Sequence, residues 1–173
     1  MNRFLIPLVS LSLLLPAAGF AAPDRNGAIA AMRALPIQYR SGILRLSADH
    51  GKPAPPYWAI IARNPTRRGL PTSITVTGGQ VTSERATLNP RALISGDSPI
   101  TLGRVRIDST EAWQIARRFA SDRGRRLDSV SYVLQQRGSS AAAVWSIWCY
   151  DSRGHYIGFL SLLASTGAIL STD

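Results

Sequence analysis

The most regular hydrophobic pattern in the chain covers residues 109–123. Apolar side chains recur there at the three- and four-residue spacing of one helical face: Ala112, Ile115, Ala116, Phe119 and Ala120. Asp108 and Glu111 have the spacing of a capping box at a helix N-terminus, and Gly124 is a typical residue at a helix end. This pattern predicts a helix over 109–123.

Strand-like alternation of apolar and polar residues follows this helix. Segments of strand length, separated by turn residues, lie near 129–136, 143–151, 155–164 and 168–171. Asp151 and Gly154 mark a tight turn between the second and third of these segments. A helix followed by antiparallel strands can bury its apolar face only against one face of the sheet, which predicts an α+β arrangement.

The first half of the chain shows the same order of elements. A short helix is expected to start at Asn26 and to end at Pro36, because proline cannot continue a helix. Alternating segments then predict strands near 42–49, 57–63 and 72–77, with a short tail near 80–83.

An offset of 87 residues relates the two halves. It superposes Trp58 on Trp145 and Ile60 on Ile147. Further apolar residues follow the same offset: Ile43 on Val130, Leu46 on Val133, and Ala28, Ile29 and Met32 on Ile115, Ala116 and Phe119. An offset held across a helix and two strands indicates a tandem duplication. We therefore expect two tandem units, each with one helix packed on a three- to four-stranded antiparallel sheet: 23–84 and 105–173, joined by a connecting segment over 85–104.

Residues 1–22 have the features of a secretory signal peptide. Arg3 supplies the positive charge, a 12-residue apolar run follows it, and small residues around Ala21 provide a cleavage site. The apolar run is shorter than the roughly 20 residues that span a bilayer. The sequence therefore predicts export to the periplasm or the medium, with no membrane span once the signal is removed.

Export predicts a specific change in mass. Protein recovered from the periplasm or the medium should lack about 21 or 22 N-terminal residues, because signal peptidase cleaves after small residues. Intact-mass measurement checks this result. Full-length protein found only in the cytosol would contradict the prediction.

The charge of the chain is strongly positive and comes almost entirely from arginine. The formal net charge is +10, with 19 arginines and the single lysine Lys52. One interpretation is attraction to phosphate, lipopolysaccharide or acidic protein surfaces; the other is the codon bias of a G+C-rich gene. Nucleic acid is not expected as a partner, since no basic motif with interleaved aromatic residues is present. The single cysteine, Cys149, excludes an intramolecular disulfide framework.

The second unit resembles PepSY-type domains, small modules found in peptidase propeptides and in exported bacterial proteins. Three family motifs, W-x-V, D-x-x-G and D-A-x-T-G-x-V, match residues here: Trp145 and Ile147; Asp151 and Gly154; and Ala164, Thr166, Gly167 and Ile169, with Leu163 in place of the usual aspartate. The first unit matches through Trp58, Ile60, Thr77 and Gly78. The resemblance implies a non-enzymatic role: binding or inhibiting a protein partner in the cell envelope, a protease among the candidates.

Residues with catalytic chemistry are few and have structural explanations. Asp151, Ser152 and His155 lie within one hairpin turn, where polar residues are common, and a four-residue turn cannot supply the geometry of a catalytic triad. Cys149 is expected to fill the core rather than to act as a reactive thiol. His50 and His155 are the only histidines, so we expect no metal site, no cofactor and no enzymatic activity.

One strand face is expected to carry aromatic residues away from the helix. Alternation along 143–151 places Trp145 under the helix and Trp148 and Tyr150 on the opposite side, with Tyr57 and Ile61 in the corresponding places of the first unit. These four residues are the candidate partner-binding surface. Alternatively, the two units cover each other, or their sheets join and the linker covers the face, or the faces are assigned wrongly.

A second candidate surface is basic. Five arginines surround the end of the predicted helix: Arg117, Arg118, Arg123, Arg125 and Arg126. They predict an anion-binding envelope protein as the alternative function, with lipopolysaccharide or phosphate as the ligand. They are equally compatible with a solvated face whose charge complements the helix dipole. Salt distinguishes anion binding, which it weakens, from an aromatic protein interface.

Overall fold

The computed structural model describes residues 25–63, 71–86, 97–138 and 141–173. The expected signal peptide lies outside these residues. The helical elements are α1 (Ala28–Ala34), α2 (Ile37–Arg40), η3 (Leu102–Arg104) and α3 (Ser109–Asp122). The strands are β1 (Ile43–Gly51), β2 (Trp58–Arg63), β3 (Pro71–Thr77), β4 (Gln80–Ala86), β5 (Asp97–Ser98), β6 (Ser129–Arg137), β7 (Val144–Tyr150), β8 (Tyr156–Leu163) and β9 (Ile169–Thr172).

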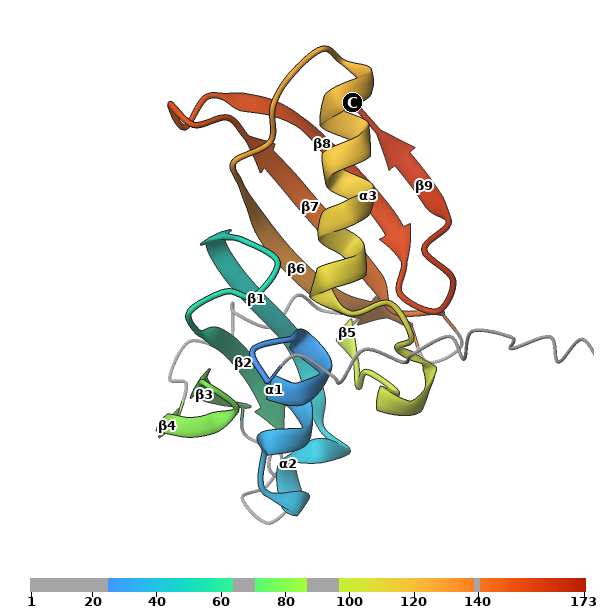
Figure 1. Ribbon diagram of the computed structural model, residues 1–173. Helices are drawn as coiled ribbons and strands as arrows, with labels where there is room; N and C mark the ends of the chain where they lie inside the picture. Colours follow the sequence, from blue (N-terminus) through green and yellow to red (C-terminus); the bar gives the residue numbers. More distant parts are fainter. Residues whose placement is uncertain (1–24, 64–70, 87–96, 139–140) are drawn as a thin grey trace, which may run out of the picture.

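All strands of the described residues belong to one antiparallel sheet, so the α+β class is confirmed. The strand order is β4-β3-β2-β1-β6-β7-β8-β9, and β5 pairs with β6 outside this path (Figure 1). The halves of the chain meet where β1 pairs with β6, with Leu46 opposite Leu134 and Ser47 opposite Val133. The sheets of the two halves therefore join into one, which is one of the alternatives that the sequence left open. The pairing removes two exposed strand edges, whose unpaired backbone groups would otherwise invite association with other chains.

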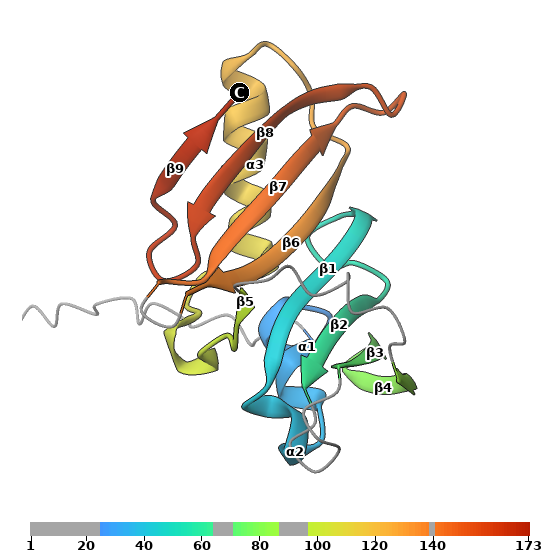
Figure 2. The ribbon, with the colours of Figure 1, turned by 180° about the vertical axis from the view of Figure 1, so that it is seen from behind.

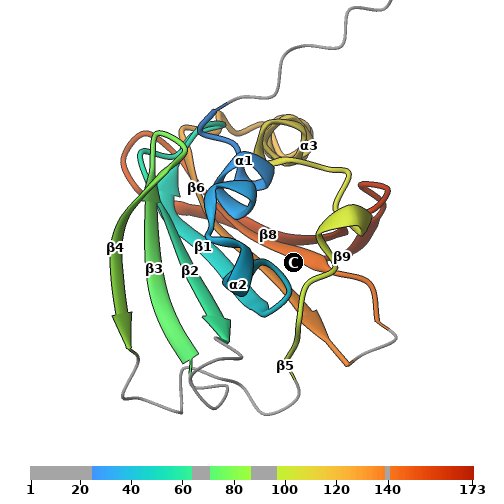
Figure 3. The ribbon, with the colours of Figure 1, turned by 90° about the horizontal axis from the view of Figure 1, so that it is seen from below.

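The described helices lie on one face of this sheet. Figure 3, from below, shows α1, α2 and α3 on the same side, with α1 near β2 and β3 and α3 near β7 and β8. Seen from behind, the opposite face carries no helix of the described residues (Figure 2). We call this opposite side the open face.

An aromatic cluster lies where the two halves share their core. The ring centroids of Trp58 and Trp145 are 6.3 Å apart. The centroid of the Tyr132 ring is 5.7 Å from that of Trp58 and 5.8 Å from that of Trp145. Both indole N–H groups donate to a backbone carbonyl just before a helix, Trp58 to Asn26 at 2.8 Å and Trp145 to Ile107 at 3.0 Å. Both tryptophans are fully buried, which confirms the expected position of Trp145 under the helix.

The 87-residue offset holds in part of the sheet and fails at a β-bulge. Ile43 faces Ala62 as Val130 faces Cys149, which preserves the offset. The bulge in β1 then adds one residue. Leu46 pairs with Ile60, but Ile147, the equivalent of Ile60 by the offset, pairs with Tyr132 and not with Val133. The expectation that Leu46 corresponds to Val133 is therefore wrong.

The helices also depart from the offset. The N-caps Gly27 and Asp108 lie 81 residues apart, and α1 has 7 residues against 14 in α3. Ala28 and Ile115, which the 87-residue offset aligns, therefore do not occupy equivalent positions in the two helices. Pro36 ends α1 as expected, but the chain then forms the additional short helix α2, for which Pro36 is the N-cap.

The connecting segment begins later than expected, and its described end contacts the sheet. Arg85 still belongs to β4. The buried residue Ile100 donates its N–H to the carbonyl of Ile43 at 2.7 Å, which ties the end of the segment to β1. In the part of the chain that the structure describes, no helix has the length and hydrophobicity needed to cross a membrane.

Asp108 caps two helices with one carboxylate. The predicted capping box is confirmed: Asp108 Oδ1 accepts the N–H of Ser109 at 2.7 Å, and Glu111 Oε2 accepts that of Asp108 at 3.0 Å. The same Oδ1 also accepts the N–H of Ile29 in the first turn of α1, at 3.1 Å. A Cβ atom at Gly27 would collide with this carboxylate. Asp108 therefore links the N-termini of α1 and α3.

Asp108→Ala should lower the free energy of unfolding by about 2 kcal/mol, since it removes two caps of roughly 1 kcal/mol each. Asp108→Asn should retain most of the stability, because the amide oxygen still accepts both N–H groups. Burial raises the pKa of the Asp108 carboxyl above its ordinary value.

Because its pKa is raised, the Asp108 carboxyl binds its proton more tightly in the folded state than in the unfolded chain. The contribution of Asp108 to the free energy of unfolding therefore falls as the pH rises. Urea unfolding of the wild type, Asp108→Ala and Asp108→Asn across the acidic pH range measures both the loss of capping and this pH dependence. An Asn variant as unstable as the Ala variant would contradict the capping role.

Candidate functional site

The alternation along β7 separates core from surface as the sequence predicts. Trp145, Ile147 and Cys149 are fully buried on the helix side. Trp148 and Tyr150 are half-buried on the open face. The face assignment from the sequence is therefore confirmed.

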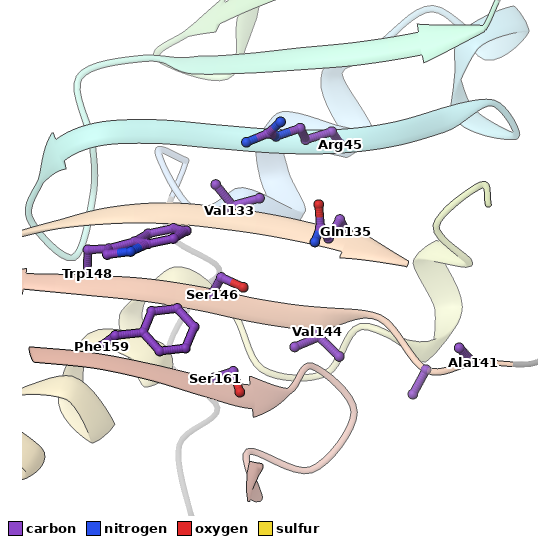
Figure 4. A pocket seen from close by; sticks show the side chains of 10 residues that line it. Arg45, Val133, Gln135, Ala141, Val144, Ser146, Trp148, Phe159 and Ser161 are labelled. Carbon is purple, nitrogen blue, oxygen red and sulfur yellow. The ribbon is translucent and has the colours of Figure 1, made fainter. Parts of the chain in front are cut away.

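A hollow of about 570 Å³ lies on the open face across the junction of the two halves. We call it the sheet hollow. Its lining comes from β1, β6, β7, β8 and the β6–β7 loop: Arg45, Val133, Gln135, Ala141, Ala142, Val144, Ser146, Trp148, Phe159 and Ser161 (Figure 4).

Register explains why the sheet is hollowed at this point. One row of directly paired residues consists of small side chains, Val133 opposite Ser146 and Ser146 opposite Ser161. The next row contains the pair Trp148 and Phe159, whose ring centroids are 5.2 Å apart. Large side chains beside a row of small ones leave a depression bounded at one end by aromatic rings.

The chemistry of the sheet hollow favours binding over proton transfer. Among the described residues that line it, Arg45 carries the only formal charge, and none is histidine or a carboxylic acid. Ser161 Oγ lies 2.7 Å from Ser171 Oγ in a hydrogen bond. The hollow can therefore accommodate an apolar side chain against Trp148 and Phe159, and an anionic or carbonyl oxygen at Arg45.

The four predicted partner-binding residues do not all lie in the sheet hollow. Trp148 lines it, and Ile61 borders it through its pairing with Arg45. Tyr150 lies beside it, with its ring 5.1 Å from His50 and 6.1 Å from Tyr156. Tyr57 precedes β2, is 45% exposed and does not line the hollow.

Sequence reasoning missed Phe159, Gln135 and Arg45. Each belongs to a different strand from Trp148, so only the strand order and register bring them together. The alternation of β8 gave a signal for Phe159, which lies opposite Trp148 across the predicted hairpin.

The turn between β7 and β8 is organised by Asp151. Its Oδ1 accepts the backbone N–H groups of Arg153 and His155, both at 2.9 Å, and its Oδ2 lies 3.4 Å from His155 Nδ1. Partial desolvation raises the pKa of the Asp151 carboxyl, but the hydrogen bonds and the nearby imidazole outweigh it, and the net pKa is lowered. The carboxylate is thus occupied as a turn acceptor, as the turn interpretation predicts.

Cys149 is a buried free thiol. Burial raises its pKa to about 12, so the thiol stays protonated at neutral pH. This environment agrees with the expectation that Cys149 fills the core. Within the described ranges, no group of three or more His, Cys, Asp or Glu side chains is placed to hold a metal ion.

The five predicted anion-binding arginines separate into two sets. Arg117, Arg118, Arg125 and Arg126 line a second hollow beside α3. Arg123 instead places its guanidinium carbon 3.7 Å from the centroid of the Phe119 ring and donates to the carbonyl of Asp173. We call the second hollow the arginine hollow.

Compared with protein-family models, curated proteins and solved structures, the chain matches none of them. The PepSY resemblance therefore stays a prediction from the motifs around Trp145, Asp151 and Gly167.

Proposed function

We propose that the chain is an exported, non-enzymatic module that binds a protein partner in the cell envelope through the open face of its sheet. The observation that carries the proposal is the sheet hollow, with the paired rings of Trp148 and Phe159 beside a row of small side chains. Aromatic residues at the centre of a patch are the residues that most often anchor protein interfaces.

The lining of the hollow favours a particular kind of partner surface. An apolar side chain can pack against Trp148 and Phe159, while Arg45 and Gln135 supply donors for a carboxylate or backbone carbonyls. The polar floor of Ser146 and Ser161 tolerates solvent in the free protein. We therefore expect the partner to present an apolar residue flanked by acidic groups.

Two further features support the comparison with tandem PepSY-like units. Trp58 and Trp145 are both buried and donate to carbonyls at corresponding places before α1 and α3. Ala62 and Cys149 occupy corresponding buried positions opposite Ile43 and Val130. The resemblance favours a protease as the partner and inhibition as the effect, with the connecting segment joining units that share one sheet.

The proposal is tested by recovering a partner from envelope extract and measuring its affinity for the wild-type chain and for the variant Trp148→Ser/Tyr150→Ser. Loss of binding in the variant supports the open face as the interface. Binding that falls steeply with salt and is insensitive to this variant would point away from an aromatic interface.

A further inference from the structure

The arginine hollow is a site of about 580 Å³ with an apolar floor and a cationic rim. Its lining residues are Trp113, Arg117, Arg118, Ser121, Arg125, Arg126 and Leu127. Trp113 and Leu127 are each 8% exposed and form the floor. Charges beside such apolar walls attract a counter-ion more strongly than charges surrounded by water.

The end of α3 brings the two pairs of arginines together. Gly124 has a positive φ of 66°, and the N–H of Arg125 returns to the carbonyl of Ala120 at 2.9 Å. This glycine turn reverses the chain against the end of the helix. Arg125 and Arg126 therefore lie alongside Arg117 and Arg118, although the sequence separates the pairs by six residues.

The cationic rim is poorly compensated by the protein itself. Arg125 Nη2 lies 3.4 Å from Asp151 Oδ2. No ion pair joins Arg117, Arg118 or Arg126 to any acidic group among the described residues. Holding like charges around one hollow is unfavourable in isolation and becomes favourable when a multivalent anion occupies it.

Capping of the helix C-terminus does not account for this arrangement. The carbonyls of Ala120 and Ser121 are already satisfied by backbone N–H groups of residues 123–125. The last turn of α3 contains no basic residue, and Arg117 and Arg118 lie one turn earlier. The arginines therefore do not serve as C-terminal caps of the helix.

We propose that the arginine hollow binds an anion that carries two or more phosphate groups. Each guanidinium offers a planar fork of donors that matches two phosphate oxygens, and four such forks exceed what one phosphate can engage. The buried indole of Trp113 and the side chain of Leu127 can contact the apolar part of a larger ligand. The same chemistry is presented by a soluble pyrophosphate and by a diphosphorylated lipid headgroup.

The test compares two charge-matched variants of the purified protein. Arg117→Gln/Arg126→Gln removes two charges from the hollow, whereas Arg85→Gln/Arg104→Gln removes two exposed charges elsewhere. Isothermal titration with pyrophosphate and with inorganic phosphate measures the soluble ligands. Sedimentation with phosphatidylcholine vesicles, with and without diphosphoryl lipid A, measures the headgroup.

We expect pyrophosphate or lipid A vesicles to bind the wild-type protein more tightly than inorganic phosphate or plain vesicles. The hollow variant should lose at least about tenfold in affinity, while the control variant changes by less than about twofold at the same salt. Binding of pyrophosphate alone identifies a soluble ligand, and binding of lipid A vesicles alone identifies a headgroup.

Equal losses in the two variants would overturn the proposal, because they would show attraction to net charge without a site. Absence of binding by both pyrophosphate and lipid A vesicles would also overturn it. Melting curves of both variants check that each is folded, and these outcomes are independent of binding at the open face.

Discussion

Trp145→Ala is expected to lower the free energy of unfolding by about 3 to 5 kcal/mol, the usual cost of truncating a large buried aromatic residue. The indole is fully buried, packs against the rings of Trp58 and Tyr132, and donates to the carbonyl of Ile107. Its removal leaves a cavity at the junction of the two halves and an unpaired carbonyl. Denaturant unfolding at equilibrium measures the effect.

Trp58→Ala should cost a similar amount, because Trp58 is equally buried and donates to the carbonyl of Asn26. Trp145→Phe is the matched control, since it keeps most of the ring volume and loses the N–H donor. We expect it to cost much less than the alanine variant. A loss below about 1 kcal/mol in either alanine variant would show that the indole is not part of the core.

The double variant Trp58→Ala/Trp145→Ala distinguishes one shared core from two independent cores. The ring centroids are 6.3 Å apart, so the two effects should couple by about 0.5 kcal/mol or more rather than add. Additive losses would indicate that each half is stabilised separately. The joined sheet predicts coupling and a single unfolding transition.

Local patterns predicted the individual elements well. Helix α3 was recognisable from its apolar face and from the pair Asp108 and Glu111, because both signals act within a few residues. The alternation in β7 likewise identified which side chains are buried. In contrast, α2 was missed because a helix of 4 residues has no measurable periodicity.

The junction of the halves could not be read from the sequence. Pairing of β1 with β6 joins residues about 88 positions apart, such as Leu46 and Leu134, and depends on two strand edges that no local pattern identifies. The bulge in β1 also shifts the register by one residue. Leu46 is therefore buried in the core, whereas Val133, its expected counterpart, lies on the open face.

The sequence predicted the residues of the candidate sites that a local pattern identifies, but not those that other strands or a turn bring to the same place. Trp148 could be placed on the open face from alternation alone, whereas Arg45 and Phe159 reach the sheet hollow through the register of other strands. The arginines near the end of α3 were visible as a cluster. Their convergence over Trp113 and Leu127 depends on the turn at Gly124.

Trp148→Ser/Tyr150→Ser should abolish partner binding while the fold is largely retained. Both side chains lie on the open face, where Trp148 contacts Phe159 and Tyr150 contacts His50 and Tyr156. Aromatic residues at interface centres commonly contribute about 2 kcal/mol or more each, so we expect a loss of affinity of roughly thirtyfold or more from each substitution.

Ile169→Ser/Leu170→Ser provides a matched control. Both residues are large, apolar and about half exposed on β9, and neither lines the sheet hollow. The control removes a comparable exposed apolar surface from the same molecule. We expect it to bind the partner with wild-type affinity.

The most direct measurement of the proposed interface is the affinity of the purified partner for the wild-type chain, Trp148→Ser/Tyr150→Ser and the β9 control, with a thermal melt of each protein. The account predicts lost binding and a nearly unchanged melting temperature in the Trp148 and Tyr150 variant alone. If these side chains instead support the fold, the melting temperature should fall by several degrees for each kcal/mol lost. A destabilised variant that still binds the partner would contradict the open face as the binding site.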